Sequence, residues 1–226
     1  MSGKLSSSLS ILTKNNFFFD LDGTLVDSSY HHDIAFKNAL FQDYPKLADC
    51  FDYEVMKGKK TRDVFEELGI TKLEHLTSLT EAKQKYYREC INSGEISLYS
   101  TGMELLEYLK LLGKNLYLIT GSSRESVHSV LKSCQIRDFF SGVLTSEDVK
   151  LNKPHPDIFL LGLSKFNLDS ENTLTIEDSH NGIVASQMAG IDVVMVNSPK
   201  AQQNIPCFDS LKDFYLYVRA QYEDLI

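Results

Sequence analysis

The sequence predicts an α/β fold, a doubly wound parallel sheet with an α-helical cap domain inserted into it. Three observations lead to this fold class. Short apolar runs alternate with segments of helical periodicity over the last two thirds of the chain. Several of these runs are apolar throughout, which is typical of parallel strands covered by helices on both faces. The segment that follows the first apolar run is helical in pattern and contains few strand-like runs.

Five apolar runs are the expected strands, and each of them ends in polar or small residues. They lie at 17–20, 116–120, 141–145, 173–177 and 193–197. The helical patterns between them lie at 102–112, 124–134, 156–166 and 180–189. Parallel strands need a crossover connection, and a helix of this length provides one. We therefore expect βαβ units and a parallel sheet.

The helical cap domain is expected at residues 28–96, with helices near 32–41, 61–68 and 73–91. It interrupts the α/β domain, so the core domain is predicted to comprise residues 1–27 and 97–226. Linkers near 27–29 and 93–100 would join the two domains. Residues 1–14 lack the apolar stretch of a signal peptide, and we expect a loose polar lead-in there.

Composition and charge exclude several classes of protein. The 226-residue chain has a net charge of −8 and no cluster of Lys and Arg, which argues against a nucleic-acid-binding face. No apolar run approaches the roughly 20 residues that span a bilayer, so no membrane association is expected. The four cysteines are far apart, and we expect buried, reduced thiols in a cytoplasmic protein. They are Cys50, Cys90, Cys134 and Cys207. We expect a monomer, with a dimer as the alternative.

Two carboxylates follow the apolar run 17–19. Asp20 and Asp22 stand at the carboxyl end of that strand, so that in an extended chain both side chains lie on one side. Ligands of open parallel sheets bind at this edge. Paired carboxylates repel each other unless a cation neutralises them, and Mg²⁺ takes oxygen ligands of this kind. The alternative is a solvated acidic turn in which Asp27 caps the next helix.

Polar residues also end the second predicted strand. Thr120, Gly121 and Ser122 precede a helix, where a hydroxyl group and backbone N–H groups can bind an anion. The alternative is an ordinary helix cap, which uses the same residue types.

Two further charged features lie at the same edge of the predicted sheet. Glu177 and Asp178 form a second acidic pair at the end of a strand, and a plain helix entry is the alternative. Lys153 stands between an Asn and a Pro just before a helix. It would supply local positive charge that the acidic chain otherwise lacks, whereas an ordinary lysine would be solvated.

Four motifs carry these residues, and together they resemble the haloacid dehalogenase superfamily. They are Asp20-Leu21-Asp22-Gly23-Thr24-Leu25-Val26-Asp27-Ser28, then Thr120, then Lys153-Pro154-His155-Pro156, then Glu177-Asp178-Ser179-His180-Asn181-Gly182. The resemblance covers the chain from residue 17 to about residue 197. The place of the helical insert resembles the subgroup with a small helical cap, which holds β-phosphoglucomutases and many sugar-phosphate and phosphoglycolate phosphatases.

The resemblance implies a Mg²⁺-dependent phosphatase that acts on a small phosphorylated metabolite through an aspartyl-phosphate. Asp20 would be the nucleophile, and Asp22 would protonate the leaving oxygen and then deprotonate water. The implied phosphate-binding groups are Thr120, the Gly121 amide and Lys153. The implied Mg²⁺ ligands are the Asp20 carboxylate, the Asp22 carbonyl and Asp178, with Glu177 in or beside the coordination sphere.

A phosphomutase is the alternative within the superfamily. Ser28 and His32 resemble a Thr-x-x-x-His segment of the mutases, and Lys57, Gly58 and Arg62 resemble their cap loop. That loop, however, has one extra residue here. The other interpretation of its basic residues is a solvated turn on the cap.

Two other departures favour a phosphatase. Ser123 stands where a mutase-type lysine is expected, and Thr24 is the residue typical of phosphatases in the first motif. The residues expected to touch the substrate are His32, Lys57, Arg62 and Ser122. A third hypothesis is a non-catalytic metabolite- or protein-binding member, and the intact set Asp20, Asp22, Lys153 and Asp178 weighs against it.

Overall fold

The computed structural model describes residues 11–198 and 204–223. Its strands form one parallel sheet in the order β3-β2-β1-β4-β5. They are β1 (Asn16–Phe19), β2 (Asn115–Ile119), β3 (Phe140–Leu144), β4 (Thr173–Glu177) and β5 (Asp192–Met195). The predicted doubly wound parallel sheet is therefore confirmed.

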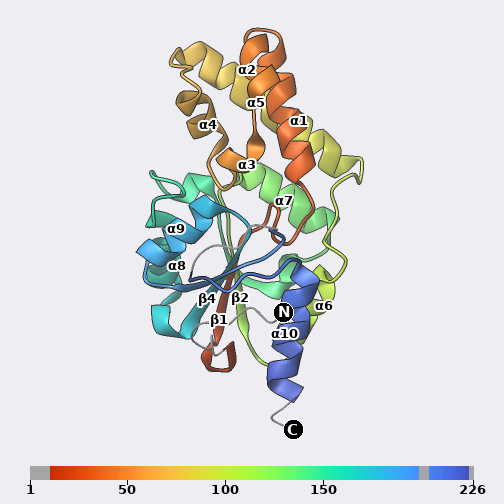
Figure 1. The fold of residues 1–226 in the computed structure, drawn as a ribbon, viewed down its shortest axis with the longest axis vertical. Helices are drawn as coiled ribbons and strands as arrows, with labels where there is room; N and C mark the ends of the chain where they lie inside the picture. Colours follow the sequence, from red (N-terminus) through yellow and green to blue (C-terminus); the bar gives the residue numbers. More distant parts are fainter. Residues whose placement is uncertain (1–10, 199–203, 224–226) are drawn as a thin grey trace.

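Helices cover both faces of this sheet (Figure 1). On one face lie α6 (Gly102–Leu111), α7 (Arg124–Ser133) and α10 (Leu211–Glu223), and on the other α8 (Asp157–Phe166) and α9 (His180–Met188). Phe17 and Phe19 belong to the first apolar layer, whereas Phe18 belongs to the second. Because successive side chains of a strand point to opposite faces, a strand that is covered on both faces must be apolar throughout.

The order of the strands determines where a site can form. From β1 the chain builds β2 and β3 on one side, and it then crosses to β4 and β5 on the other side. The order reverses between β1 and β4, and the carboxyl ends of the strands open a crevice at such a point. The residues that follow β1, β2 and β4 therefore meet there.

The segment between β1 and β2 is a helical insert. Its helices are α1 (Ser29–Phe41), α2 (Pro45–Cys50), α3 (Tyr53–Met56), α4 (Thr61–Glu67) and α5 (Leu73–Asn92). They share an apolar cluster of their own, which includes Phe36, Phe51 and Phe65. Figure 1 shows the insert stacked beyond one end of the sheet. The division into a core and a separate cap domain stays a prediction. The short helices α2 and α3, and the last helix α10, were not among the expected elements.

The two connections between the insert and the sheet lie side by side. The Asp27 N–H donates to the Ser97 carbonyl at 3.0 Å, and the Tyr99 N–H donates to the Leu25 carbonyl at 3.0 Å. The expected linkers are thus joined to each other by backbone hydrogen bonds, so that they form a two-stranded connection.

Part of the expected polar lead-in is packed instead. Ile11 begins the 3-10 helix Ile11–Thr13 and is fully buried, and the buried Lys14 pairs with Asp192 at 2.6 Å. The prediction is wrong for these residues because an apolar side chain and a paired lysine tie them to the sheet. Residues 1–10 lie outside the described part of the chain.

The cysteine prediction is correct in part. All four thiols are free, and Cys90 is buried, whereas Cys134 and Cys207 are half-buried. Cys50 is exposed, which corrects the expectation of burial, because it ends the short surface helix α2. Within residues 11–198 and 204–223, no helix combines the length and the apolar character that crossing a membrane requires.

Candidate active site

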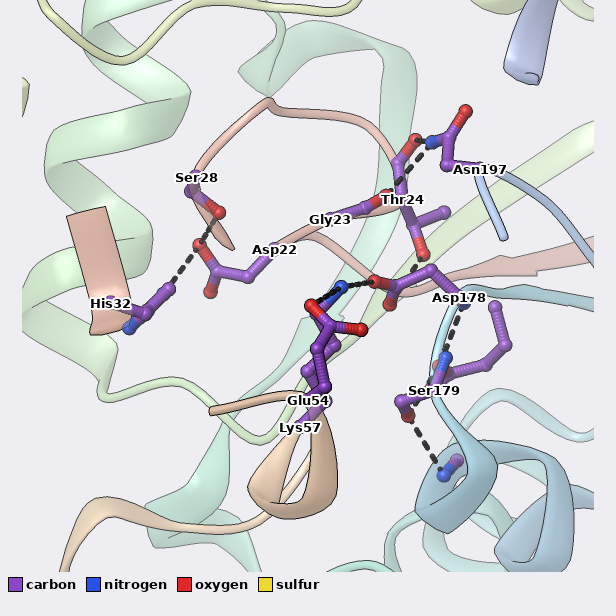
Figure 2. Close-up of polar contacts among 12 residues, drawn as sticks. Asp22, Gly23, Thr24, Ser28, His32, Glu54, Lys57, Asp178, Ser179 and Asn197 are labelled. Carbon is purple, nitrogen blue, oxygen red and sulfur yellow. Dashed lines mark hydrogen bonds and ion pairs between the residues drawn. The ribbon is translucent and has the colours of Figure 1, made fainter. Parts of the chain in front are cut away.

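The turn after β1 carries Asp20 and Asp22 and is held in place by distant parts of the chain. Gly23 has a φ of +82°, and a Cβ atom there would lie 2.0 Å from an Asp178 carboxylate oxygen, so only glycine fits. The Asn197 amide donates to the carbonyls of Gly23 at 2.8 Å and Thr24 at 3.0 Å (Figure 2). The position of both carboxylates is therefore set by contacts with the residues that follow β4 and β5.

Lys153 lies at the centre of the site, and its side chain is fully buried. Its ammonium group lies 2.8 Å from Asp20 Oδ1 and 2.5 Å from Glu177 Oε1, and it donates to the Ile119 carbonyl at 3.2 Å. Burial alone would lower the pKa of Lys153, but the two carboxylates raise it above its ordinary value. The ammonium is therefore charged and balances the charge on Asp20.

Glu177 positions other groups of the site. Its second oxygen accepts a hydrogen bond from the Ser179 hydroxyl at 2.9 Å, at the point where α9 begins. A Cβ atom on Gly182 would lie 1.9 Å from the first oxygen, so this position needs glycine. Glu177 thus links Lys153 to the start of α9.

Asp20, Glu177 and Asp178 form a buried acidic cluster. Each offers a carboxylate oxygen, and these oxygens lie within 4.8 Å of one another. Burial raises the pKa of Asp20 above its ordinary value, and Lys153 offsets only part of this rise. Burial likewise raises the pKa of Asp178 to about 7 although Lys57 opposes the change. Carboxylates this close together repel one another in their ionised forms, and a nearby cation would relieve this repulsion.

The acidic cluster fits a hard divalent cation such as Mg²⁺, because all its donors are oxygens. The Oδ2 atom of Asp178 is buried, and the Lys57 ammonium lies 3.2 Å from it, so a cation already approaches this oxygen. Both oxygens of Glu177 already accept hydrogen bonds, so Asp20 and Asp178 are the more available ligands.

A cavity of about 20 Å³ lies over this end of the sheet, with room for about one water molecule. Its core wall consists of Asp20, Asp22, Thr120, Gly121 and Ser122. Its insert wall consists of His32, Phe36, Tyr53, Gly58, Lys59, Thr61 and Lys83. Thr120 is buried, and its hydroxyl accepts from the Ser122 N–H at 3.2 Å just before α7. The insert therefore closes directly over the residues that follow β1 and β2.

Asp22 turns away from Asp178 toward the insert (Figure 2). Its Oδ1 accepts from the Ser28 hydroxyl at 2.9 Å and from the Tyr87 hydroxyl, and its Oδ2 accepts from the Ser122 hydroxyl. Burial would raise the pKa of Asp22, but His32 and these hydroxyl donors hold it well below its usual range. Asp22 is therefore ionised in this arrangement.

A second buried lysine stands behind His32. His32 Nε2 lies 3.0 Å from Asp22 Oδ1, and His32 Nδ1 lies 2.6 Å from the Lys83 ammonium. The His32 ring stacks on Tyr87, with centroids 4.0 Å apart. Burial, assisted by the charge of Lys83, lowers the pKa of His32 to about 4, and burial lowers that of Lys83 to about 7. His32 is therefore neutral at neutral pH.

The insert residues that were expected to touch the substrate do not all lie at the site. His32 lines the cavity, and Lys57 reaches Asp178 at 3.2 Å. Arg62 does not line the cavity. It is 44% exposed and pairs with Glu66 on the surface of α4 at 2.9 Å, which is the solvated alternative. Of these two basic residues, Lys57 therefore points toward the core and Arg62 toward solvent.

Lys83 and Tyr87 were not predicted from the sequence, and Ser28 was placed in a linker and in the mutase-like segment. Lys83 and Tyr87 lie one helical turn apart on α5, the longest helix of the insert. Both are buried although the segment around them is rich in charged residues, such as Glu81, Lys85 and Arg88, and the helical period places them on one face. The four-residue spacing of Lys83 and Tyr87 was the sequence signal for a shared buried face. A solvated lysine can stand at the same spacing, so the signal does not identify a buried one.

A family model described as haloacid dehalogenase-like hydrolase matches residues 17–196. The chain belongs to this family. The expected resemblance is thus confirmed, and as a member of this hydrolase family the protein is an enzyme.

Known proteins and solved structures also match this hydrolase over most of its length. The pyrophosphatase PpaX of Bacillus thuringiensis (strain Al Hakam) is 29% identical over 184 residues, which are 81% of this chain and 83% of the relative. A β-phosphoglucomutase structure from Clostridium difficile superposes with a TM-score of 0.78 at 25% identity and covers 94% of this chain and 98% of that one. CbbY of Rhodobacter sphaeroides, solved with phosphate, has a TM-score of 0.73 at 21% identity over 89% of this chain and 95% of its own, which shows the shared fold.

Proposed function

We propose that this hydrolase is a Mg²⁺-dependent phosphatase that acts on a small phosphorylated metabolite of the sugar-phosphate or phosphoglycolate type. One observation carries the proposal. The Asp20 carboxylate is buried at the end of the central strand, with the Lys153 ammonium 2.8 Å away and the buried acidic cluster beside it. A carboxylate held in this way can attack a phosphoryl group. Membership of the family and the pyrophosphatase relative support hydrolysis of a phosphate bond.

The proposed reaction has two halves that share Asp20 and Asp22. First, Asp20 attacks phosphorus and the bond to the leaving oxygen breaks, while Asp22 donates a proton to that oxygen. Water then attacks the aspartyl-phosphate, Asp22 takes a proton from this water, and Asp20 is released as a carboxylate. Because the donors around Asp22 keep it ionised, Asp22 has to leave Ser28 and Tyr87 and take up a proton from solvent before it can act as the acid.

Binding the phosphoryl group falls to residues that follow β2 and to Lys153. The Thr120 hydroxyl and the Gly121 amide stand before α7, where helix geometry favours an anion. Asp20, Asp178 and the Asp22 carbonyl would hold Mg²⁺. When bound, this ion supplies positive charge that neutralises phosphoryl oxygens, on which phosphoryl transfer chiefly depends.

The insert, residues 28–96, is proposed to be a cap domain. The cavity of about 20 Å³ is too small for a phosphorylated metabolite, so the substrate enters only when the insert moves away from the sheet. The proposed compartment is the cytoplasm, which fits the four free thiols.

The test is a phosphate-release screen over sugar phosphates, phosphoglycolate and pyrophosphate, with Mg²⁺ and with a chelator. We expect release only with Mg²⁺ and its loss in Asp20→Asn. Asp27→Asn is the matched control, because Asp27 belongs to the same motif but is exposed and lies outside the cavity. Release that persists in Asp20→Asn, or no release from any substrate, would contradict the proposal.

A phosphomutase is the second candidate. It is favoured by the contacts of Ser28 and His32 with Asp22, which match the mutase-like segment, and by the likeness to the β-phosphoglucomutase structure. A mutase would interconvert a hexose 1-phosphate and 6-phosphate with little free phosphate. Product analysis with Mg²⁺ therefore separates the two candidates.

A further inference from the structure

The loop between α3 and α4, residues 57–60, ties the insert to the core, and we call it the strap. The Lys57 ammonium lies 3.2 Å from Asp178 Oδ2 and 2.9 Å from Glu54 Oε1. Figure 2 shows Lys57 and Glu54 reaching from the insert toward Asp178. The Lys57 carbonyl also accepts a hydrogen bond from the Asn181 amide at 2.7 Å. Lys57 therefore holds the start of α9 with its side chain and with its backbone.

The next residue of the strap fits the core closely. Gly58 has a φ of +82°, and a Cβ atom there would lie 2.6 Å from the Ser179 hydroxyl oxygen. A Cβ atom on Gly121 would lie 2.5 Å from the Gly58 carbonyl oxygen. Glycine at both positions lets the two backbones touch. The position of the strap against the core therefore depends on these two glycines as well as on the contacts of Lys57.

The strap places a positive charge on a carboxylate of the acidic cluster. A lysine side chain is an ammonium at neutral pH, and this one lies against the carboxylates of Asp178 and Glu54. This inference rests on the proposed function, in which Asp178 is a Mg²⁺ ligand. An ammonium and a divalent cation at the same carboxylate repel each other.

We infer that Lys57 is an internal cation that competes with the divalent metal for Asp178, so that metal binding and closure of the strap oppose each other. In the closed state, the ammonium neutralises part of the acidic cluster. A metal ion that enters the cluster displaces Lys57 and favours an open insert, which admits the substrate. The coupling is reciprocal, because each event changes the other by the same factor.

The test is the affinity for Mg²⁺, measured by calorimetry without substrate, in three variants. Lys57→Met removes the competing charge. Asn181→Ala removes only the hydrogen bond to the strap and leaves every charge in place. Lys60→Met is the matched control, because Lys60 lies on the same strap and forms no ion pair with the core in residues 11–198 and 204–223.

We expect Lys57→Met and Asn181→Ala each to tighten the dissociation constant of Mg²⁺ about tenfold, and Lys60→Met to leave it unchanged. A strap that is closed in about nine molecules of ten would weaken the apparent affinity by this factor. Hydrogen exchange of residues 57–62 in the wild type should accelerate when Mg²⁺ is added, which reports opening independently of activity.

The outcomes separate this inference from the proposed function. Binding of Mg²⁺ by the wild type, with unchanged affinity in Asn181→Ala and unchanged exchange of the strap, overturns the competition and leaves the phosphatase proposal intact. Tighter binding in Lys57→Met and Lys60→Met alike, without an effect of Asn181→Ala, means a general charge effect and also overturns it. No binding of Mg²⁺ by any variant overturns both.

Discussion

Replacing Lys153 by methionine keeps a buried chain of similar length and removes its charge. Two carboxylates then lose their partner: Asp20 at 2.8 Å and Glu177 at 2.5 Å. At an effective dielectric constant near 20, each pair corresponds to roughly 6 kcal/mol of Coulomb attraction. Most of this is offset by the desolvation of the ammonium, and breaking a buried pair costs about 3–5 kcal/mol in practice. We expect this loss in the free energy of unfolding at pH 8.

The cost should shrink at lower pH. Without Lys153, the folded-state pKa of Asp20, which burial already raises, rises further. Above the unfolded pKa, the folded variant then binds more protons than its unfolded chain, so its stability falls as the pH rises. The difference between the wild type and the variant is therefore expected to widen from pH 5 to pH 8.

Urea denaturation at pH 5, 6.5 and 8 measures this difference. Lys14→Met is the matched control, because Lys14 is also buried but its partner Asp192 is 60% exposed. It should cost only about 1 kcal/mol, with no widening over the same range. A loss below about 1 kcal/mol for Lys153→Met, or an equal loss at pH 5 and pH 8, would refute the reasoning.

Three further predictions concern the residues around the catalytic carboxylates. Gly182→Ala pushes a methyl group against Glu177, where the Cβ atom would lie 1.9 Å from the carboxylate, so we expect a loss of about 1–3 kcal/mol in urea denaturation together with reduced turnover. His32 has a folded-state pKa of about 4 against an ordinary 6.5, so the unfolded chain binds its proton first as the pH falls, and stability is lost between these values. The loss should be about 3 kcal/mol, and His32→Asn should remove this slope from the unfolding data. Tyr87→Phe removes a donor to Asp22 and keeps the ring stacked on His32, so the Asp22 pKa should rise. Asp22 has to be protonated in the first half of the reaction, so the basic limb of the pH profile of kcat/KM should shift upward, and an unshifted limb would contradict that role.

Much of the fold could be predicted because the strands have a clear physical signature. The run 17–19 is apolar on both sides, since Phe17 and Phe19 pack against one helical layer and Phe18 against the other. The short helices α2 and α3 give no such signal, because six and four residues are too few to show a helical period. The packing of Ile11 and Lys14 was missed because their partners lie far away in the sequence.

The candidate site was predictable where its residues end strands, and less so where they come from the insert. Asp20 and Asp178 are brought together because β1 and β4 are neighbours in the sheet, and Lys153 reaches Asp20 from the connection between β3 and α8. Lys83 was not found, because a lysine in a charged amphipathic helix is usually solvated, whereas here its ammonium packs against His32 and Phe36 of α1. The same reasoning failed to separate Lys57 from Arg62, whose directions depend on the path of the strap.

The central claim is that Asp20 becomes phosphorylated during turnover. The most direct test is rapid acid quenching of the protein with Mg²⁺ and p-nitrophenyl phosphate, followed by mass spectrometry of the peptide that contains Asp20. We predict a mass increase of one phosphoryl group on Asp20 in the wild type and none in Asp20→Asn. Turnover without a phosphorylated Asp20, or a phosphoryl group on another residue, would contradict the account.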